Sequence, residues 1–334
     1  MTESRISSIA MDEPVLVYIL AASHSGSTLT AMLLNSHPDV CTAGELKATS
    51  LGDTSRYRCS CRMLIGDCPF WQNVSVEMRR LGLEYDVRNA GTSLQDVPSR
   101  YAARLLRPLH RARGAELVRD LMLQASPVWR RYFPQWTARN HALIRSIAGV
   151  AGVRVVADSS KIAIRLKYLR KNPDLKIKVV QLVRDGRAVA LTYMNPSNFA
   201  DASDPKLRGG GSGDERHQCL SMTEAATEWL RSNEEAMQVL KTIPADDQIR
   251  ISYEEICTNP ASTLKEVHRF LGLREDDGFN ELRSAEHHVV GNGMRLDDTS
   301  EVRLDDRWRT NLTSADLHEF DRIAGRLNNR LGYN

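Results

Sequence analysis

The stretch VLVYILAASHSGSTLTAMLL, residues 15–34, joins an apolar run to a turn of small residues and an amphipathic helical pattern. The apolar run is too short to cross a bilayer, and it follows Asp12 and Glu13 rather than basic residues. We therefore interpret residues 15–21 as a buried strand and not as a targeting segment. We expect a cytoplasmic protein without a transmembrane segment.

The turn SHSGST, residues 23–28, has the composition of a phosphate cradle. Small residues let backbone N–H groups surround an anion, and the N-terminus of the following helix adds its positive dipole end. The turn differs from the P-loop of nucleotide hydrolases, which needs a lysine where Ser27 stands. For this motif alone, the alternative is a tight strand–helix turn that binds no ligand.

Three more apolar, β-branched runs predict buried parallel strands at 153–157, 176–183 and 248–252. Each precedes a turn and a helical pattern, which predicts an α/β fold with a doubly wound parallel sheet and ligands beyond the carboxyl ends of its strands. We expect one domain, 1–334, with a Cys/Arg-rich and largely helical insertion at 50–147 that caps or lines the ligand site. Residues 195–218 lack periodicity and hold three consecutive glycines, which predicts a mobile loop.

The composition is that of a globular enzyme rather than of a disordered or fibrous chain, with 42% hydrophobic and 26% charged residues. The net charge of +3 is unevenly spread, because residues 100–145 hold ten arginines and only Glu116 and Asp120 as acidic residues. This surplus indicates an anionic neighbour, such as an anionic cofactor, an acidic substrate or a membrane surface. The aromatic residues there do not alternate with the arginines as a base-stacking platform requires, so we expect no nucleic-acid partner.

The strand at 176–183 leads into LVRDGRAVALT, residues 182–192, which holds a second candidate anion site. If a helix begins near Asp185, Arg184 and Thr192 lie about two turns apart and both can reach one ligand. A guanidinium with a hydroxyl suits a phosphate, whereas alone the pattern also fits a surface arginine beside a helix cap. Together the two sites imply a ligand with phosphates at both its 5′ and 3′ ends.

With both sites in place, the sequence resembles the PAPS-dependent sulfotransferase family, whose donor is 3′-phosphoadenosine 5′-phosphosulfate (PAPS). The resemblance spans most of the chain and covers the insertion weakly, although the pattern CSCRMLIGDCPFW, residues 59–71, occurs in bacterial members. The segment similar to the 3′-phosphate motif is close to the form found in tyrosylprotein sulfotransferases. The matching segments are SHSGSTLTAMLLNSHPDVCTAGE (23–45) for the 5′-phosphosulfate loop, LVRDGRAVALT (182–192) for the 3′-phosphate motif, ISYEEICTNPASTLKEVHRFLGL (251–273) for a late strand–helix signature, and VGNGMRL with DDRWRTNL (290–296 and 305–312) for the C-terminal loop.

The resemblance implies transfer of a sulfuryl group from PAPS to an acceptor hydroxyl, with no metal. Arg184 and Thr192 would hold the 3′-phosphate, although Thr192 stands where the family usually has serine. Arg295, near the C-terminal loop, would add charge there. The residues that would bind the 5′-phosphosulfate are Ser23, His24, Ser25, Gly26, Ser27 and Thr28.

His24 departs from the family pattern, because relatives place lysine or arginine before the Ser-Gly pair. That cation steadies charge on the oxygen between sulfur and the departing phosphate. An imidazolium does so only while protonated, and its reference pKa is about 6.5. Our hypothesis is that the dianionic leaving group holds His24 protonated, or that Lys161 supplies the charge from just past the strand at 153–157. A solvated lysine is the alternative for Lys161.

Glu45 matches the glutamate that serves as the catalytic base in tyrosylprotein sulfotransferases. A carboxylate there can take the acceptor proton if burial raises its pKa, and the alternative is a glutamate at a helix start. His287 and His288 are other candidate bases, since they lie beside the C-terminal loop. His37 is expected to be structural.

Cys59, Cys61 and Cys68 form a cluster in the sequence. Three thiolates without a well-spaced fourth ligand fall short of a structural zinc site, so we predict no metal. A Cys61–Cys68 disulfide and free thiols are the two readings left open.

Two other functions compete with sulfuryl transfer. A P-loop kinase or NTPase would need the missing lysine and a Mg²⁺-holding Ser/Asp pair, which Asp158 could imitate. A nucleotide-binding protein that transfers nothing is favoured by His24 in place of the usual cation. The acceptor stays open among carbohydrate, lipid, phenol, peptide tyrosine and natural-product hydroxyls, and the Arg-rich insertion favours one that carries negative charge. The oligomeric state cannot be read from the sequence.

Overall fold

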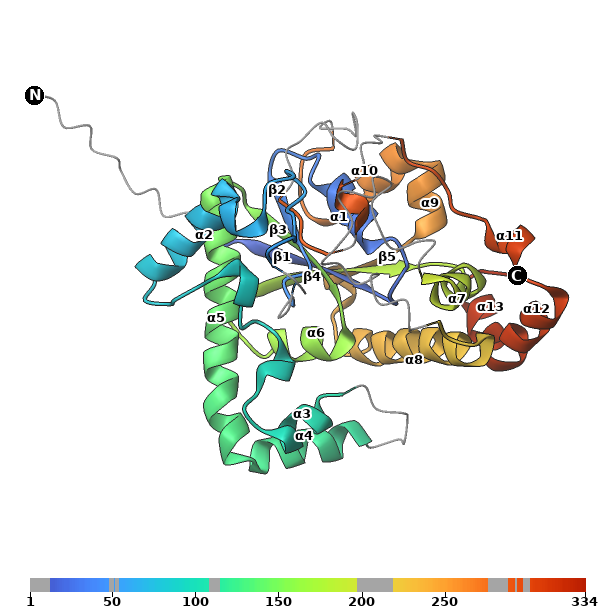
Figure 1. Ribbon diagram of the computed structural model, residues 1–334, viewed down its shortest axis with the longest axis horizontal. Coiled ribbons are helices and arrows are strands. Elements are labelled where there is room, and N and C mark those ends of the chain that lie inside the picture. The colour runs from blue at the N-terminus through green and yellow to red at the C-terminus, as the bar shows by residue number, and fades with distance from the viewer. Residues whose placement is uncertain are drawn as a thin grey trace, which may run out of the picture.

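The computed structural model describes residues 13–47, 51, 54–107, 115–196, 219–275, 288–291, 293–296 and 301–334. It has an α/β fold with a five-stranded parallel sheet in the order β2-β3-β1-β4-β5 (Figure 1). The strands are β1 Val15–Ala21, β2 Val40–Gly44, β3 Val155–Lys161, β4 Lys176–Val183 and β5 Gln248–Ser252.

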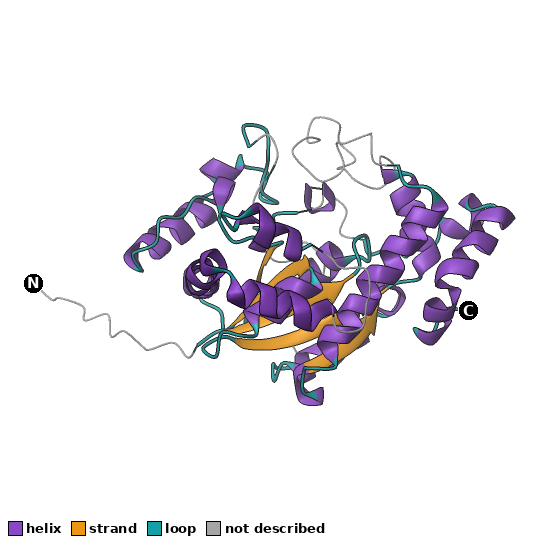
Figure 2. Cartoon of the chain, turned by 90° about the horizontal axis from the view of Figure 1, so that it is seen from below, coloured by secondary structure: helices purple, strands orange, loops and turns teal. Residues whose placement is uncertain are grey.

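Both faces of the sheet are buried, as β1 shows. Alternate residues of a strand point to opposite faces. Leu16, Tyr18 and Leu20 therefore join a core with α2 (Pro69–Arg80), α5 (Pro127–Ala151) and α6 (Ala163–Leu169). Val17, Ile19 and Ala21 join a second core with α1 (Ser27–Leu34), α9 (Tyr253–Thr258) and α10 (Pro260–Phe270). The doubly covered parallel sheet predicted from the sequence is confirmed, and Figure 2 shows the helices packed around it.

Two details of the predicted strands were wrong. The sequence analysis missed β2, because VCTAG is short and lacks the run of branched apolar residues that marks the other strands. The strand predicted at 153–157 begins at Val155 and continues to Lys161. Lys161 is thus the last residue of β3 and does not follow the strand.

The segment between β2 and β3 is largely helical. It holds α2, α3 (Arg100–Leu105), α4 (Ala115–Ala125) and the long helix α5. Figure 1 shows α3 and α4 near the end of α5 that lies away from the sheet. Its arginines are partly used in internal contacts, because Arg119 is buried beside Glu116 and Arg139 donates to the carbonyls of Glu84 and Ala90.

The second half of the chain adds helices beyond β4 and β5. They are α7 (Gly186–Met194), α8 (Met222–Leu240), α11 (Trp308–Asn311), α12 (Ser314–Phe320) and α13 (Arg326–Arg330). Most of the predicted mobile loop at 195–218 lies outside the described residues. None of the helices in the described ranges has the length and apolar character that crossing a bilayer requires. The cytoplasmic location stays a prediction.

Candidate active site

The turn between β1 and α1 has the backbone of an anion cradle. His24 and Gly26 both adopt the left-handed conformation, with φ of 63° and 86°. A Cβ atom on Gly26 would come closer than 3.0 Å to the Tyr253 ring, so only glycine fits there. The Ser25 hydroxyl is buried and has no hydrogen-bond partner among the described residues. A buried orphan hydroxyl at a helix N-terminus indicates a ligand with acceptor atoms.

Arg184, which follows β4, lies against this turn. Its Nη1 donates to the carbonyl of His24 at 2.8 Å, and its Nη2 donates to the carbonyl and carboxylate of Asp305 at 3.0 and 3.1 Å. The guanidinium also stacks 4.2 Å from the centre of the Tyr253 ring. Its Nε is buried and lacks a partner within the described part of the chain. The structure thus brings together the two sites that the sequence placed 160 residues apart.

Thr192 reaches the same region through the last turn of α7. Its buried hydroxyl donates to the carbonyl of Ala188 at 3.1 Å and keeps its lone pairs. The neighbouring Tyr193 ring contacts the His24 ring edge-on, with 4.7 Å between their centres. The helix end therefore packs against the cradle.

His24 is surrounded by positive charge. Burial lowers its pKa, and Lys161 and Arg184 lower it further, to about 4, although Glu45 opposes them. The imidazole is therefore neutral at pH 7 in this structure. The protonated His24 of our hypothesis would have to overcome all three effects.

Glu45 and Lys161 form an ion pair at the carboxyl ends of β2 and β3. Lys161 Nζ donates to Oε1 of Glu45, and Lys47 Nζ lies 3.2 Å from Oε2. Burial raises the Glu45 pKa, but Lys161 and Lys47 outweigh it and bring the pKa down to about 2. The condition set for a base, a pKa raised by burial, is therefore not met here, because two ammonium groups accompany the carboxylate.

The backbone of Lys161 is strained, with a φ of 71°. Of the three non-glycine residues with positive φ in the described ranges, two, His24 and Lys161, lie at this site and the third is Arg62. Such conformations cost roughly 1–3 kcal/mol and gather at functional sites. Lys47 and Lys161 are thus held beside Glu45 by the local fold.

Asp158, the residue that could have imitated a Mg²⁺ ligand, is committed to protein contacts. Its Oδ1 accepts hydrogen bonds from the Leu46 amide and from the amide and hydroxyl of Ser160. Its Oδ2 pairs with Arg165 at 3.5 Å. Asp158 therefore fixes the loop that carries Glu45.

The segment at 288–291 closes the site on the side of β2. Val290 and the end of β2 exchange two hydrogen bonds, from Glu45 N to Val290 O and from Val290 N to Ala43 O, each of 3.1 Å. Arg295 donates through Nε and Nη2 to the Arg58 carbonyl and through Nη1 to that of Gly291, and it is fully buried. These contacts give Arg295 a role in joining two loops. His287 lies outside the described residues.

The cysteine cluster differs from the prediction in one respect that matters. All six cysteines lie in the described part of the chain and are free thiols, so of the two readings left open the disulfide is excluded in this structure. The fourth ligand that the sequence lacked is present, because His288 lies beside Cys59, Cys61 and Cys68. His288 was considered as a base, and the structure instead points its Nδ1 at sulfur atoms.

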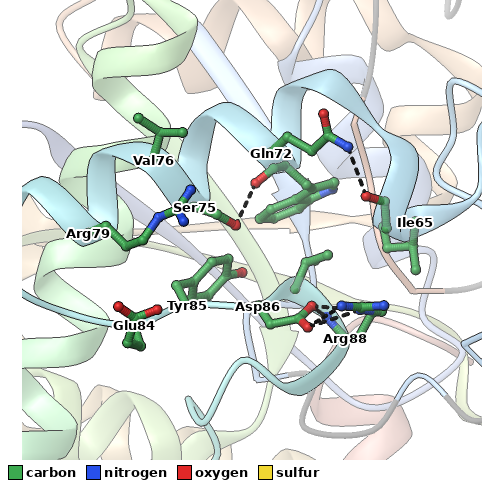
Figure 3. Close-up of a pocket in the computed structure, with 12 residues that line it drawn as sticks. Ile65, Gln72, Ser75, Val76, Arg79, Glu84, Tyr85, Asp86 and Arg88 are labelled. Carbon is green, nitrogen blue, oxygen red and sulfur yellow. Dashed lines mark hydrogen bonds and ion pairs between the residues drawn. The ribbon is translucent and has the colours of Figure 1, made fainter.

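A cavity of about 400 Å³ lies on the insertion, between α2 and residues 84–88 (Figure 3). Gln72, Ser75 and Arg79 face it from α2, with Tyr85 and Arg88 on the opposite side. No predicted site residue in the described ranges lines this cavity. The cavity is therefore separate from the predicted site residues that the structure describes.

Several residues of the site escaped the sequence analysis. Tyr253 packs on both Gly26 and Arg184, and its signal was its place directly after the strand at 248–252. Lys47 follows Glu45 by two positions, and the sequence analysis did not consider it. Asp305 stands in the segment similar to the C-terminal loop, but nothing in the sequence pairs it with Arg184.

Comparison with known proteins assigns part of the chain to a family. The family model described as "Sulfotransferase family" matches residues 173–277, which include β4, Arg184, α7, β5 and Tyr253. No curated protein matches the chain.

Solved structures give weak likenesses. The sulfotransferase domain of the Synechococcus PCC 7002 olefin synthase is 19% identical, with 95% of each chain covered and a TM-score of 0.47. The sulfotransferase domain of the curacin biosynthetic pathway is 18% identical, with 96% of this chain and 98% of that chain covered and a TM-score of 0.47. Sulfotransferase STF9 from Mycobacterium avium is 12% identical, with 97% and 78% covered and a TM-score of 0.46. At these TM-scores we draw no argument from them.

The family match includes the segment in which the sequence resembles the 3′-phosphate motif, and this segment contributes Arg184 to the site. The resemblance to sulfotransferases is thus confirmed over residues 173–277, which match the model of the sulfotransferase family, whereas the segments at 23–45, 290–296 and 305–312 lie outside the match.

Proposed function

We propose that this protein transfers a sulfuryl group from PAPS to an acceptor hydroxyl. The observation that carries the proposal is the contact of Arg184 with the cradle at 23–28, where the Ser25 hydroxyl and Arg184 Nε are both buried without a described partner. Two adjacent anion sites, each with a hydrogen-bond donor that no described residue uses, fit a nucleotide that carries a charged group at both ends of its ribose.

The turn at 23–28 would bind the 5′-phosphosulfate through backbone amides and the hydroxyls of Ser25, Ser27 and Thr28. Arg184 and Thr192 would bind the 3′-phosphate. Tyr253 supports both sites, because its ring packs on Gly26 and under the guanidinium. Arg295 uses Nε, Nη1 and Nη2 in protein contacts, so we assign the 3′-phosphate to Arg184 rather than to Arg295.

Lys161 is the better candidate for the cation that steadies the leaving oxygen. His24 is neutral with a pKa of about 4, and Lys161 is close enough to be one cause of that value. An ammonium aimed at the oxygen where charge develops stabilises the transition state more than the ground state. His24 then acts as a neutral donor or spacer in the cradle.

Glu45 would orient the acceptor hydroxyl and receive its proton. A carboxylate with a pKa of about 2 is a weak base while it is paired with Lys161 and Lys47. If Lys161 turns toward the leaving oxygen, Glu45 loses one of the charges that depress its pKa. The shared ion pair would thus couple stabilisation of the leaving group to proton removal.

The kinase alternative finds less support in the site. Ser27 occupies the position of the required lysine, and Asp158 is held by Leu46, Ser160 and Arg165. One observation still favours a protein that binds the nucleotide without turnover, because His24 is neutral where relatives have a cation. The acceptor class stays open among carbohydrate, lipid, phenol and natural-product hydroxyls, and an anionic acceptor would suit the Arg-rich insertion.

Calorimetric titration with 3′-phosphoadenosine 5′-phosphate, compared with ATP–Mg²⁺, tests the proposal. Wild-type protein should prefer the bisphosphate, and Arg184→Ala should weaken its binding by roughly 100-fold. Arg154→Ala is the matched control, since Arg154 is largely exposed and directly precedes β3, at the strand ends opposite those that carry the site. Equal bisphosphate affinity in Arg184→Ala and wild type would contradict the proposed nucleotide site. Labelled PAPS with an acceptor panel then separates turnover from binding alone.

A further inference from the structure

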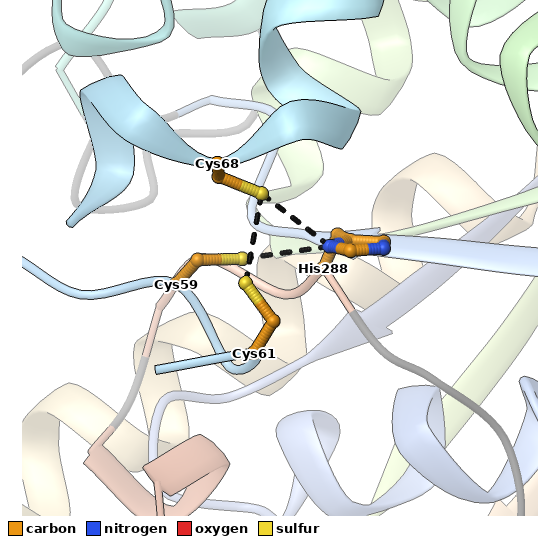
Figure 4. A group of neighbouring side chains, drawn as sticks. All are labelled: Cys59, Cys61, Cys68 and His288. Atoms are coloured by element: carbon orange, nitrogen blue, oxygen red, sulfur yellow. Dashed lines mark hydrogen bonds between the residues drawn. The ribbon is translucent and has the colours of Figure 1, made fainter. Parts of the chain in front are cut away.

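Four side chains from distant parts of the sequence converge beside the candidate active site. Cys59, Cys61 and Cys68 come from the loop that leads into α2, and His288 comes from the C-terminal half of the chain. Figure 4 shows the three sulfur atoms and the imidazole pointing toward one another. All four potential ligand atoms lie within 4.8 Å of one another.

The distances fit a tetrahedral metal site. With Zn–S of about 2.3 Å and Zn–N of about 2.0–2.1 Å, tetrahedral geometry places sulfur atoms about 3.8 Å apart and sulfur and nitrogen about 3.6 Å apart. Here Cys61 Sγ lies 3.6 Å from Cys68 Sγ, and His288 Nδ1 lies 3.4 Å from Cys68 Sγ and 3.9 Å from Cys59 Sγ. These three pairs of ligand atoms therefore have the spacing of a zinc coordination shell, and the remaining pairs lie within 4.8 Å.

The ligands are held in place by surrounding contacts. The Phe70 ring stacks on the His288 imidazole with 4.4 Å between centres and an angle of 3°. The amide of Val289, next to His288, donates at 2.8 Å to the hydroxyl of Ser60, which lies between Cys59 and Cys61, and this bond joins the two ligand-bearing segments. Cys59 and Cys68 are fully buried, and Cys61 and His288 are partly exposed. Such supporting contacts orient ligands in metal sites.

We propose that Cys59, Cys61, Cys68 and His288 bind one Zn²⁺ ion in a closed structural site. Three thiolates and one imidazole form one of the usual ligand sets for structural zinc, and four protein ligands leave no position for a reacting group. The three thiols lose their protons to solvent as the metal binds. The site lies outside the reaction proposed above and does not depend on it.

The ion would fasten the loop at 57–68 to the segment at 288–296, a pair that we call the clasp. Within the clasp, the Tyr57 hydroxyl accepts from the Gly291 amide at 2.8 Å, and Arg295 bridges to the Arg58 carbonyl. The same segment is hydrogen-bonded to Glu45 through Val290. Zinc would therefore hold the wall of the site beside Glu45.

Metal analysis of the full-length protein tests the proposal directly. The protein should be purified under reducing conditions without added metal or an affinity tag that binds metal, and its zinc measured by mass spectrometry. We expect about one zinc ion per chain. Replacement by Co²⁺ alone should give the strong ligand-field bands of a tetrahedral thiolate site and sulfur-to-cobalt charge transfer. A chain without zinc that also fails to take up equimolar Zn²⁺ or Co²⁺, or one that holds iron instead, would overturn the assignment.

Variants separate this site from adventitious binding. Cys59→Ser and His288→Ala should lower the zinc content at least tenfold, whereas Cys219→Ser, which changes an exposed cysteine outside the cluster, should keep it. His288→Cys supplies a fourth thiolate and should restore binding. Retention of zinc in Cys59→Ser would refute the proposed ligand set. Because the cobalt spectrum is measured on the unaltered chain, the test holds even if a variant fails to fold.

Discussion

The two sides of the candidate active site are built in different ways. The side at 23–28 and 184–192 rests on the central strands β1 and β4, and each of its sites comes from one continuous motif. The side of Glu45 and Lys161 rests on the edge strand β2, on β3 and on the clasp, whose parts lie more than 200 residues apart in the chain. The first side rests mainly on the sheet, with Tyr253, which directly follows β5, and Asp305 packed against Arg184. The second needs loop contacts, and these contacts decide how Glu45 is placed.

Replacing Lys161 tests whether the second side carries the chemistry. In Lys161→Ala, kcat should fall roughly 10³-fold with a smaller change in the KM for PAPS, because the lost charge acts on the leaving oxygen. Steady-state kinetics with labelled PAPS measures both constants. Lys176→Ala is the control, since Lys176 is exposed at the start of β4, away from the strand ends that carry the site. A raised KM with unchanged kcat would assign Lys161 to PAPS binding. The side of Glu45 and Lys161 would then not carry the chemistry.

Glycine substitutions compare the packing of the second side with an open position. Gly44 has a φ of 79°, and a Cβ there would come closer than 3.0 Å to the backbone of Val290. Gly82 has a similar φ of 75° but open space around it. We expect Gly82→Ala to lower the free energy of unfolding by about 1 kcal/mol from backbone strain alone, and Gly44→Ala by about 3 kcal/mol. Urea unfolding measures the loss of stability in both variants. Equal losses would show that the segment at 288–291 moves aside at no cost in free energy.

The neutral His24 makes a pH prediction for the first side. Its pKa of about 4 lies below the reference value of 6.5, so between these values the unfolded chain binds a proton that the folded chain does not. The contribution of neutral His24 to the free energy of unfolding is fully present above pH 6.5. It is lost as the pH falls toward 4, by roughly 2 kcal/mol or more.

Unfolding at pH 7 and pH 5 in wild type and in His24→Asn checks this sign. Asparagine does not titrate and tolerates positive φ better than most residues. The wild type should therefore lose more stability at pH 5 than the variant. An identical loss in the two proteins would place His24 in a wetter environment than the structure gives it.

The smallest expected effect belongs to the clasp. Tyr57→Phe removes the hydroxyl that accepts from the Gly291 amide and should cost about 1 kcal/mol, with faster hydrogen exchange at 288–291. Tyr101→Phe, at a tyrosine that is 51% exposed, should change neither quantity. Unaltered exchange in Tyr57→Phe would mean that zinc or Arg295 alone holds the segment.

The sequence predicted the strands and turns of the first side and missed most contacts of the second side, and the reason is physical. Strands with branched apolar runs and anion motifs at their ends are local patterns, so β1, β4 and Arg184 could be read directly. The partner of the three cysteines, His288, lies 220 residues from Cys68, and no local pattern links them. The low pKa of Glu45 could not be predicted for a similar reason, because it depends on Lys161, which lies 116 residues away in the chain.

The pairing of Arg184 with Asp305 sets a condition for any anion that binds there. The guanidinium already holds a carboxylate, and Asp305 keeps Arg307 as a second partner when it moves away. Binding is therefore an exchange of one anion for another, and its free energy is a difference between two ion pairs. A doubly charged phosphate monoester binds the guanidinium more strongly than the carboxylate that it replaces. A singly charged diester has the same charge as that carboxylate and gains nothing by the exchange. The internal carboxylate would thus favour terminal phosphates over phosphodiesters without a contact of its own to the bound anion.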